Sequence, residues 1–317
     1  MKLGLFVREG EPHVGRVEGD RVVDLGPGTS VLDVSQGQSL GPGLEVPAQD
    51  IQWLLPFAVA DYVDFYSSRA HVENMGRILR PGQDPLPAAW LHLPIGYHGR
   101  AGTVVVSGTD IKRPHGQRQA GDFGPTQKLD VELELGFVIG TPSAGPVPVE
   151  RALDNVFGAV LVNDWSARDI QAFEYVPLGP FLGKSFATSI SPWVTTLDEL
   201  PRVPGEPQEP EPLPHLRTEP FAYDVPLEIE LNGDVISRTN ARNLYWNVAQ
   251  QIAHLTSNGA TLRAGDLLAG GTISGSEEGQ AGSLIELTRN EGPFLQDGDE
   301  VVLRGDPLGP VAGRIVP

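Results

Sequence analysis

The stretch KLDVELELGFVIG, residues 128–140, alternates acidic and apolar side chains and predicts a β-strand. Side chains of a strand point alternately to its two faces, so Asp130, Glu132 and Glu134 should share one face and the apolar residues between them the other. A carboxylate face that meets water would make this an ordinary half-solvated strand. An enclosed face would need positive charge over it. The strand therefore predicts either a solvated sheet surface or an enclosed site that holds a cation.

Short apolar runs separated by turns predict a mainly β chain with some α-helix. The 317 residues include 38 glycines and 29 prolines, which favour short strands and ordered loops over long helices. A hairpin is expected where Asn232 and Gly233 separate two alternating runs. Strands are expected at residues 103–108, 156–164, 227–238, 266–272, 283–288 and 300–305.

Two parts of the chain differ in character. Residues 1–56 contain the runs LGLFV, HVGRVEG and RVVDLG and predict a small N-terminal β-module, whereas the denser motifs fall in residues 57–317. One long helix is expected from Asn240 as N-cap to Gly259, which can end it in the left-handed conformation. The stretch 201–220, rich in proline and acid, is interpreted as a long surface loop within the larger part.

Composition excludes several classes of protein. The formal net charge of −18 argues against nucleic acid or an anionic membrane as partner. The chain has no cysteine, so it holds no disulfide, thiolate nucleophile or cysteine-ligated metal. No window reaches the roughly 18 apolar residues of a membrane span, and the start of the sequence does not read as a signal peptide. We therefore expect a cytoplasmic protein. Because the net charge is strongly negative, binding of an anionic substrate would require cationic side chains or a metal ion at the site.

Oxygen ligands are the positive chemical signal. The phosphate-loop, dinucleotide, zinc-protease and nucleophile-elbow motifs are missing from the sequence. Asp164 ends the apolar run GAVLVND, where it either caps the next turn or points into the same pocket as Glu132 and Glu134. Converging carboxylates without thiolates suit a hard divalent cation such as Mg²⁺ or Ca²⁺.

Two further segments carry candidate catalytic groups. The segment DFYSSRAH, residues 64–71, ends in His71, which is either a structural histidine or a base that deprotonates water near a metal. The segment at residues 165–189 adds four polar side chains around a Pro and Gly loop, which either binds an anion or is simply solvated. These four are Arg168, Gln171, Tyr175 and Lys184.

At this point five segments together resemble the fumarylacetoacetase family of hydrolases. They are DYVDFYSSRAHVENMGRILR, WLHLPIGYHGRAGTVVVSGTDIKRPHGQ, KLDVELELGFVIG, VLVNDWSARDIQAFEYVPLGPFLGKSF and LRAGDLLAGGTISG, and the resemblance runs from about residue 50 to the C-terminus. It implies a small N-terminal SH3-like β-barrel, shortened here, a large catalytic domain built as a β-roll of mixed β-sheets, and a homodimer.

The resemblance also implies roles for individual residues. A catalytic Ca²⁺, or Mg²⁺ or Mn²⁺ in its place, would be held by Asp64, Glu132, Glu134 and Asp164. Asp130 is outside that set and is expected to be solvated or bonded to a loop. A second, structural Mg²⁺ would lie near Asp164, Lys184 and Thr188, where Ala187 replaces the glycine common in the family.

His71 would be the general base, oriented by Glu286, and the oxyanion would meet Arg168, Gln171 and Lys184. The substrate contacts implied are Tyr66, Arg80, Gln171, Tyr175 and Thr272.

The reaction implied is hydrolysis of the carbon–carbon bond of fumarylacetoacetate, a dicarboxylate β-diketone, to fumarate and acetoacetate in the last step of tyrosine and phenylalanine breakdown. Breaking that bond releases a carbanion, which is tolerable only as an enolate beside positive charge. One alternative is an acylpyruvate hydrolase or another enzyme of the superfamily that acts on 2-oxo or 1,3-dioxo acids. The other is a non-catalytic metal-binding relative, against which the presence of His71, Glu286, Arg168 and Lys184 weighs.

Overall fold

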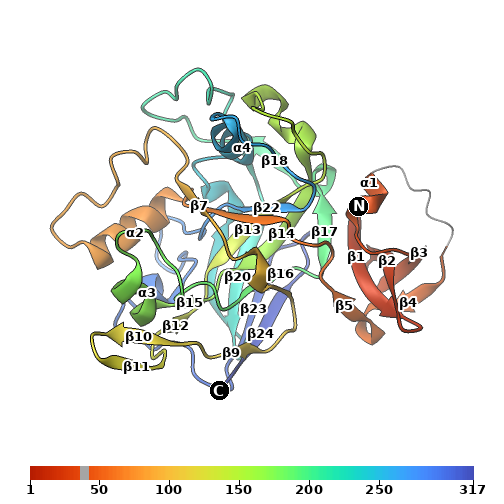
Figure 1. Cartoon of the computed structure of the whole chain (residues 1–317), viewed down its shortest axis with the longest axis horizontal. Coiled ribbons are helices and arrows are strands. Elements are labelled where there is room, and N and C mark those ends of the chain that lie inside the picture. The colour runs from red at the N-terminus through yellow and green to blue at the C-terminus, as the bar shows by residue number, and fades with distance from the viewer. Residues whose placement is uncertain (36–42) are drawn as a thin grey trace.

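A long mixed sheet organises the molecule, as the computed structural model of residues 1–35 and 43–317 shows (Figure 1). The sheet has 13 strands, of which β5 (Gln52–Leu54), β16 (Thr188–Ile190) and β8 (Val104–Val106) lie off its main path. In pairing order the main path is β4 (Glu45–Pro47), β3 (Arg21–Pro27), β2 (Glu11–Glu18), β1 (Lys2–Arg8), β17 (Trp193–Thr196), β14 (Val156–Asn163), β13 (Leu133–Ile139), β22 (Asp266–Ala269), β6 (Asp61–Phe65) and β7 (Gly96–His98).

A second sheet of five strands packs against the first through a shared apolar core. Leu227, Ile229 and Val301 of this sheet belong to the same buried cluster as Leu135 and Phe137 of β13. Its pairing order is β21 (Asp234–Asn240), β20 (Pro226–Leu231), β23 (Glu300–Arg304), β24 (Val311–Val316) and β9 (Ile111–Lys112).

The hairpin expected at Asn232 and Gly233 joins β20 to β21. Both turn residues have positive φ, 53° and 91°, as a two-residue turn of this hand requires. Three two-stranded pairs complete the β-structure: β10 (His115–Gln119) with β11 (Asp122–Pro125), β12 (Leu129–Asp130) with β15 (Ser166–Ala167), and β18 (Arg202–Pro204) with β19 (Phe221–Tyr223).

The N-terminal strands form an open arrangement. In Figure 1, β1 to β5 lie together at one side of the molecule, and β1 pairs with β2, β5 and β17. The pairing of Leu3 with Val194 makes this module continuous with the large sheet. Among the described strands no closed barrel is present, so the expected SH3-like barrel is not confirmed, whereas the mainly β character is. The division of the chain after residue 56 stays a prediction.

The described residues also contain short α-helices: α1 (Leu32–Ser35), α2 (Arg69–Leu79), α3 (Arg168–Glu174), α4 (Val248–Thr256) and α5 (Leu284–Leu287). Five 3₁₀ turns accompany them: Ala48–Asp50, Ala101–Thr103, Val149–Asn155, Leu197–Glu199 and Ala241–Asn243. No helix in the described part of the chain is long and apolar enough to cross a membrane.

The helix expected from Asn240 to Gly259 begins seven residues later than predicted. Asn240 caps only the 3₁₀ turn Ala241–Asn243, and α4 starts at Val248 behind a capping box of Asn247 and Gln250. The chain between the two asparagines is not helical, because the backbone N–H of Tyr245 donates to the carbonyl of Ser67, at 2.8 Å. Gly259, with φ of 100°, follows the helix end as expected.

The strand expected at residues 283–288 is a helix instead. Both carboxylate oxygens of Asp130 accept hydrogen bonds from the first turn of α5, from Leu284 N–H at 2.7 Å and Ile285 N–H at 3.1 Å. The free N–H groups of a helix start need such acceptors, and a carboxylate supplies them with favourable charge. The apolar run SLIEL alone could not distinguish the two structures.

The acidic, proline-rich stretch 201–220 lies on α4. It begins in β18 and is followed directly by the paired strand β19, and between them Gln208 exchanges hydrogen bonds with Gln250 of α4, at 2.7 and 3.1 Å. Leu216, within the stretch, is fully buried. The stretch therefore packs against α4, and its place within one domain stays a prediction.

Candidate functional site

The strand at residues 128–140 is enclosed on both faces. It is interrupted at Val131 and Glu132, between β12 and β13, where Glu132 N–H donates to the Asn163 side chain at 3.1 Å. Asp130, Glu132 and Glu134 are exposed by only 0%, 5% and 0%. The half-solvated alternative was wrong, and so was solvation of Asp130. That residue is instead bonded to α5 and, at 2.7 Å, to Nε of Arg168.

Three of the four predicted metal ligands converge. Asp64 lies near the end of β6, Glu134 in β13, and Asp164 directly after β14. One carboxylate oxygen from each lies within 4.8 Å of the others, and all three residues are buried. This grouping follows from the sheet, because β6 and β14 flank β13 and β22 and bring their ends to one edge.

Glu132, the fourth predicted ligand, faces cations instead of this triad. Its Oε1 contacts Nη1 of Arg168 at 2.7 Å and its Oε2 accepts a hydrogen bond from Lys184 Nζ. Lys184 also donates to Asp164 Oδ2 at 2.6 Å. Glu132 therefore joins the triad to Arg168 and Lys184, and its role as a ligand stays a prediction.

The buried cluster carries more negative than positive charge. Its five carboxylates belong to Asp64, Asp130, Glu132, Glu134 and Asp164, and the cations in contact with them are Arg100, Arg168 and Lys184. The formal excess of two negative charges equals the charge of one divalent cation. Asp64 Oδ1 and Glu134 Oε1 are buried without a hydrogen-bond partner. The residues present therefore fit a hard divalent cation, for which such oxygens are the preferred ligands.

The pKa values also distinguish Asp64 and Glu134 from Glu132. Burial and the neighbouring Asp164 carboxylate raise the pKa of Asp64 to about 7. Burial, with Asp64 and Asp164 nearby, raises the pKa of Glu134 well above its usual range. Burial opposes ionisation of Glu132 too, but Lys184 and Arg168 outweigh it and lower its pKa. Asp64 and Glu134 are thus the carboxylates whose negative charge the neighbouring cations do not fully compensate.

The predicted second cation site is a set of direct contacts. Asp164 accepts hydrogen bonds from Thr188 Oγ1 at 3.0 Å and from the Lys184 ammonium at 2.6 Å. Ala187, between them in sequence, is buried. Lys184 already supplies positive charge at this place, and a structural Mg²⁺ there stays a prediction.

His71 and Glu286 are in contact although 215 residues separate them. His71, in α2, places Nδ1 at 2.7 Å from Oε2 of Glu286, in α5. Three further donors hold the carboxylate: Asn74 at 3.0 Å, Ser274 at 2.9 Å and Ser283 at 2.6 Å. Burial opposes the charge, but His71 and these hydrogen bonds lower the pKa of Glu286 to about 2. An ionised Glu286 keeps the proton on Nδ1, which leaves Nε2 of His71 able to accept a proton.

The predicted substrate contacts are placed unevenly. The Tyr66 ring meets His71 edge-on with centroids 5.3 Å apart, and Gln171 Oε1 accepts from Arg168 Nη1 at 3.2 Å. Thr272 is buried next to Gly271, whose N–H donates to Glu134 Oε2 at 3.2 Å. Arg80, at the end of α2, donates to the carbonyl of Pro85, and Tyr175 is 38% exposed. Tyr66, Gln171 and Thr272 thus lie against site residues, whereas no contact joins Arg80 or Tyr175 to the carboxylates.

Arg100 and Tyr97 are site residues for which the sequence predicted no role. Arg100 donates to Asp164 at 2.5 Å and to Asp64 at 2.9 Å, and Tyr97 donates to Asp64 at 2.9 Å. In the sequence, both residues belong to the segment YHGR, which contributes only to the family resemblance. No local signal identified Arg100, because it reaches Asp164 across 64 residues of sequence.

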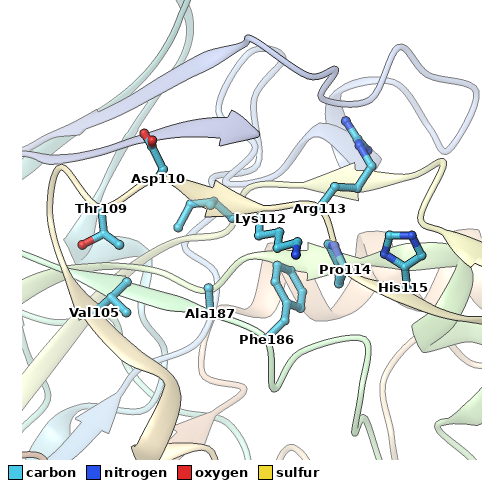
Figure 2. A pocket seen from close by; sticks show the side chains of 10 residues that line it. Val105, Thr109, Asp110, Lys112, Arg113, Pro114, His115, Phe186 and Ala187 are labelled. Carbon is cyan, nitrogen blue, oxygen red and sulfur yellow. The ribbon is translucent and has the colours of Figure 1, made fainter. Parts of the chain in front are cut away.

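Two cavities lie near these groups. One of about 1490 Å³ is lined in part by Asn74, Ser274 and Glu286, so it opens on the side of the His71 and Glu286 pair. Another, of about 400 Å³, lies beside the segment that follows Lys184 (Figure 2). Its lining is Val105, Thr109, Asp110, Ile111, Lys112, Arg113, Pro114, His115, Phe186 and Ala187. Neither cavity is lined by Asp64, Glu134 or Asp164.

Comparison of the sequence with known proteins identifies relatives along most of the chain. The family model described as Fumarylacetoacetate (FAA) hydrolase C-terminal matches residues 61–316. The chain is 46% identical to the fumarylacetoacetase of Homo sapiens over 298 residues, which cover 83% of this chain and 71% of that protein. It is 48% identical to the fumarylacetoacetase of Caenorhabditis elegans over 287 residues, covering 82% and 69%.

Solved structures share the fold. A fumarylacetoacetate hydrolase from Exiguobacterium antarcticum superposes with a TM-score of 0.71 at 22% identity, covering 100% of this chain and 99% of that one. A 5-carboxymethyl-2-hydroxymuconate delta-isomerase from Mycobacterium smegmatis gives 0.67 at 21% identity, with the same coverage. At this identity the likeness concerns the fold alone.

Proposed function

The chain belongs to the fumarylacetoacetate hydrolase family, and from this we propose that it hydrolyses the carbon–carbon bond of fumarylacetoacetate to give fumarate and acetoacetate. The observation that carries the proposal is the buried triad of Asp64, Glu134 and Asp164, in which the first two each have an oxygen without a hydrogen-bond partner. The buried His71 and Glu286 pair supports it. Identity of 45–48% to fumarylacetoacetases from animals supports the choice of substrate.

We assign the catalytic cation to Asp64, Glu134 and Asp164, with Glu132 beside them. A bound divalent cation would polarise the diketone oxygens as a Lewis acid and make the enolate a tolerable leaving group. The oxygen-only donor set fits Ca²⁺, Mg²⁺ or Mn²⁺. A second Mg²⁺ near Lys184 and Thr188, assembly as a homodimer and a cytoplasmic location belong to the same proposal, on the strength of the family resemblance.

His71 is the general base of the proposed reaction. With Nδ1 held by the Glu286 carboxylate, Nε2 takes a proton from water, and the hydroxide attacks the carbonyl next to the alkene. The carbon–carbon bond then breaks, its electron pair leaves as the acetoacetate enolate, and a proton returns to that carbon. Fumarate and acetoacetate result, with one water consumed.

Arg168 is the strongest candidate for stabilising the oxyanion. Its Nε and Nη1 are bound to Asp130 and Glu132, but its Nη2 is buried without a partner. A buried guanidinium N–H that lacks an acceptor is free to donate to a charge that develops during the reaction. Gln171 lies against the same guanidinium and Lys184 against Glu132, so the three predicted donors are neighbours. A bound divalent cation would bring the formal charge of the cluster to zero, which would allow a protein of net charge −18 to accept a dicarboxylate beside the free Nη2 of Arg168.

The direct test is turnover of fumarylacetoacetate by the purified, metal-supplemented protein. We expect loss of the ultraviolet absorbance of the diketone together with stoichiometric release of fumarate, and slower turnover of acylpyruvates. Faster turnover of an acylpyruvate would instead identify the protein as an acylpyruvate hydrolase of the same family. No turnover of any of these diketones would contradict the proposal.

A further inference from the structure

Arg100 bridges two of the carboxylates assigned to the cation. Its Nη1 donates to Asp164 Oδ1 at 2.5 Å, and its Nη2 donates to Asp64 Oδ2 at 2.9 Å. Asp64 lies in β6 and Asp164 directly follows β14, and these two strands are separated in the sheet by β13 and β22. One guanidinium therefore holds together two ligands that belong to strands not paired with each other.

The arrangement around Arg100 fixes its side chain. The guanidinium lies over the rings of Tyr62 and Tyr97, 4.8 and 5.1 Å from their centroids, and the side chain is only 6% exposed. Such stacking favours a cation held between aromatic faces. Tyr97 adds a relay, because its hydroxyl accepts from Arg100 Nη2 at 2.9 Å and donates to Asp64 Oδ2 at 2.9 Å.

The backbone is shaped to bring Arg100 inward. Arg100 has φ of 75° and ψ of 7°, in the left-handed region that non-glycine residues seldom occupy, and Gly99 before it has φ of 124°. The turn is held by Gly99 N–H donating to the carbonyl of Tyr62 at 3.0 Å and by Thr103 Oγ1 donating to the carbonyl of Arg100 at 3.1 Å. A left-handed residue at a site is retained where the surrounding structure requires it.

We infer that Arg100 is a positioning residue of the metal site. It binds Asp64 through Oδ2 and so leaves Oδ1, which has no partner, to face the cation. By bridging to Asp164 it sets the separation of two ligands before the cation arrives, and groups behind metal ligands commonly act in this way. The inference rests on the metal-dependent function proposed above.

The test separates geometry from charge by comparing Arg100→Lys with the unchanged protein. Lysine keeps the positive charge but cannot bond both carboxylates as a planar fork does. Ca²⁺ is titrated into chelator-treated protein by calorimetry at pH 7.5. We expect Arg100→Lys to weaken Ca²⁺ binding by about tenfold or more, the usual effect of losing a group that orients a ligand. Affinity within about twofold of the unchanged protein would overturn the inference.

The matched control is Arg113→Lys. Arg113 is also a buried arginine with several acceptors: its guanidinium bonds Asp297 at 2.6 Å, the carbonyl of Thr126 at 3.0 Å and that of Leu295 at 2.9 Å. Figure 2 shows its side chain extending away from Phe186 and Ala187. We expect this variant to lose thermal stability and keep its Ca²⁺ affinity. An equal loss of Ca²⁺ affinity in both variants would reduce the effect to general destabilisation and overturn the inference.

A second variant decides the matter if Arg100→Lys does not fold. Tyr97→Phe keeps the ring under the guanidinium and removes one hydrogen bond each from Arg100 and Asp64. We expect Ca²⁺ binding about threefold to tenfold weaker, the value of one or two hydrogen bonds, and unchanged affinity would overturn the inference. If the unchanged protein itself binds neither Ca²⁺ nor Mg²⁺, the proposed function fails first and the inference falls with it.

Discussion

Asp64 and Glu134 each keep one carboxylate oxygen in the interior without a hydrogen-bond partner. Native interiors rarely leave such atoms unpaired, because desolvation without compensation costs about 1–3 kcal/mol per group and more for a charged one. Glu132, two residues from Glu134 on the same stretch, is saturated by Lys184 and Arg168. Two glutamates only two residues apart thus have opposite electrostatic environments, and their substitution should have different effects on stability.

Glu134→Gln should raise the stability of the chelator-treated protein while weakening Ca²⁺ binding. The amide removes a carboxylate that burial and Asp64 already push toward its neutral form, yet it supplies the cation with less charge. We expect a higher melting temperature without metal and affinity lower by about tenfold or more. A lower melting temperature without metal would contradict this account of Glu134.

Glu132→Gln should lower the stability of the metal-free protein. Losing this carboxylate leaves Lys184 and Arg168 with fewer counter-charges, and breaking a buried pair typically costs about 3–5 kcal/mol. Denaturant unfolding of the two metal-free variants side by side gives the comparison. Equal effects of both substitutions would show that the two glutamates share one environment.

His71→Ala should remove most of the activity and little of the stability. Loss of a general base costs about 10²–10⁴ in rate, and we expect kcat to fall in that range while the melting temperature changes by a few degrees. His98→Ala is the control, since that histidine also contacts a carboxylate, Asp61 at 2.9 Å, but its side chain is 60% exposed. A kcat for His71→Ala equal to that of His98→Ala would remove His71 as the base.

The sequence near helix α4 predicts that a helix forms, whereas a tertiary contact determines where it begins. The apolar periodicity and Gly259 predicted a helix correctly, but not its first residue, because two asparagines can cap and only the pairing of Tyr245 with Ser67 selects Asn247. The run SLIEL became a helix for a similar reason, since its N–H acceptor Asp130 is more than 150 residues away. Contacts of that range leave no local signal in a sequence.

Asn247→Ala should therefore destabilise the protein, because Asn247 is the residue that caps helix α4. The side chain accepts from Gln250 N–H at 3.1 Å in a buried capping box. Loss of an N-cap costs about 0.5–2 kcal/mol, and urea unfolding should show a decrease of that size with kcat unaffected. No decrease would place the start of the helix elsewhere.

The molecule as a whole carries a net charge of −18 and encloses a cluster of five carboxylates that three cations only partly balance. From the sequence, the mainly β class, the hairpin at Asn232, the convergence of Asp64, Glu134 and Asp164, and the family could be predicted. The arginine that balances two of these carboxylates could not, because Arg100 reaches Asp164 across 64 residues from a left-handed turn. The open pairing of the N-terminal strands with β17 also depends on a contact across nearly 200 residues.

Stability of the metal-free protein should fall as pH rises from about 4 to 7. In that window the unfolded chain has released the Asp64 proton, whose ordinary pKa is 3.8, while the folded chain retains it up to about pH 7. The folded state then binds more protons, so the free energy of unfolding decreases with pH. Glu134 acts in the same direction.

Thermal unfolding of chelator-treated protein at pH 5 and pH 8 measures this effect, and we expect the lower melting temperature at pH 8. Saturating Ca²⁺ should weaken or reverse the trend, because the cation favours ionised ligands. A metal-free protein that is more stable at pH 8 than at pH 5 would contradict the charge excess assigned to the cluster.

The central claim is that hydrolysis depends on a divalent cation held by the carboxylates of Asp64, Glu134 and Asp164. The most direct measurement is fumarate release from fumarylacetoacetate by protein that has been exhaustively chelated and then supplied with Ca²⁺. We expect the chelated protein to be inactive and Ca²⁺ to restore turnover. Full activity after chelation, with no metal detected in the protein by mass spectrometry, would contradict the claim.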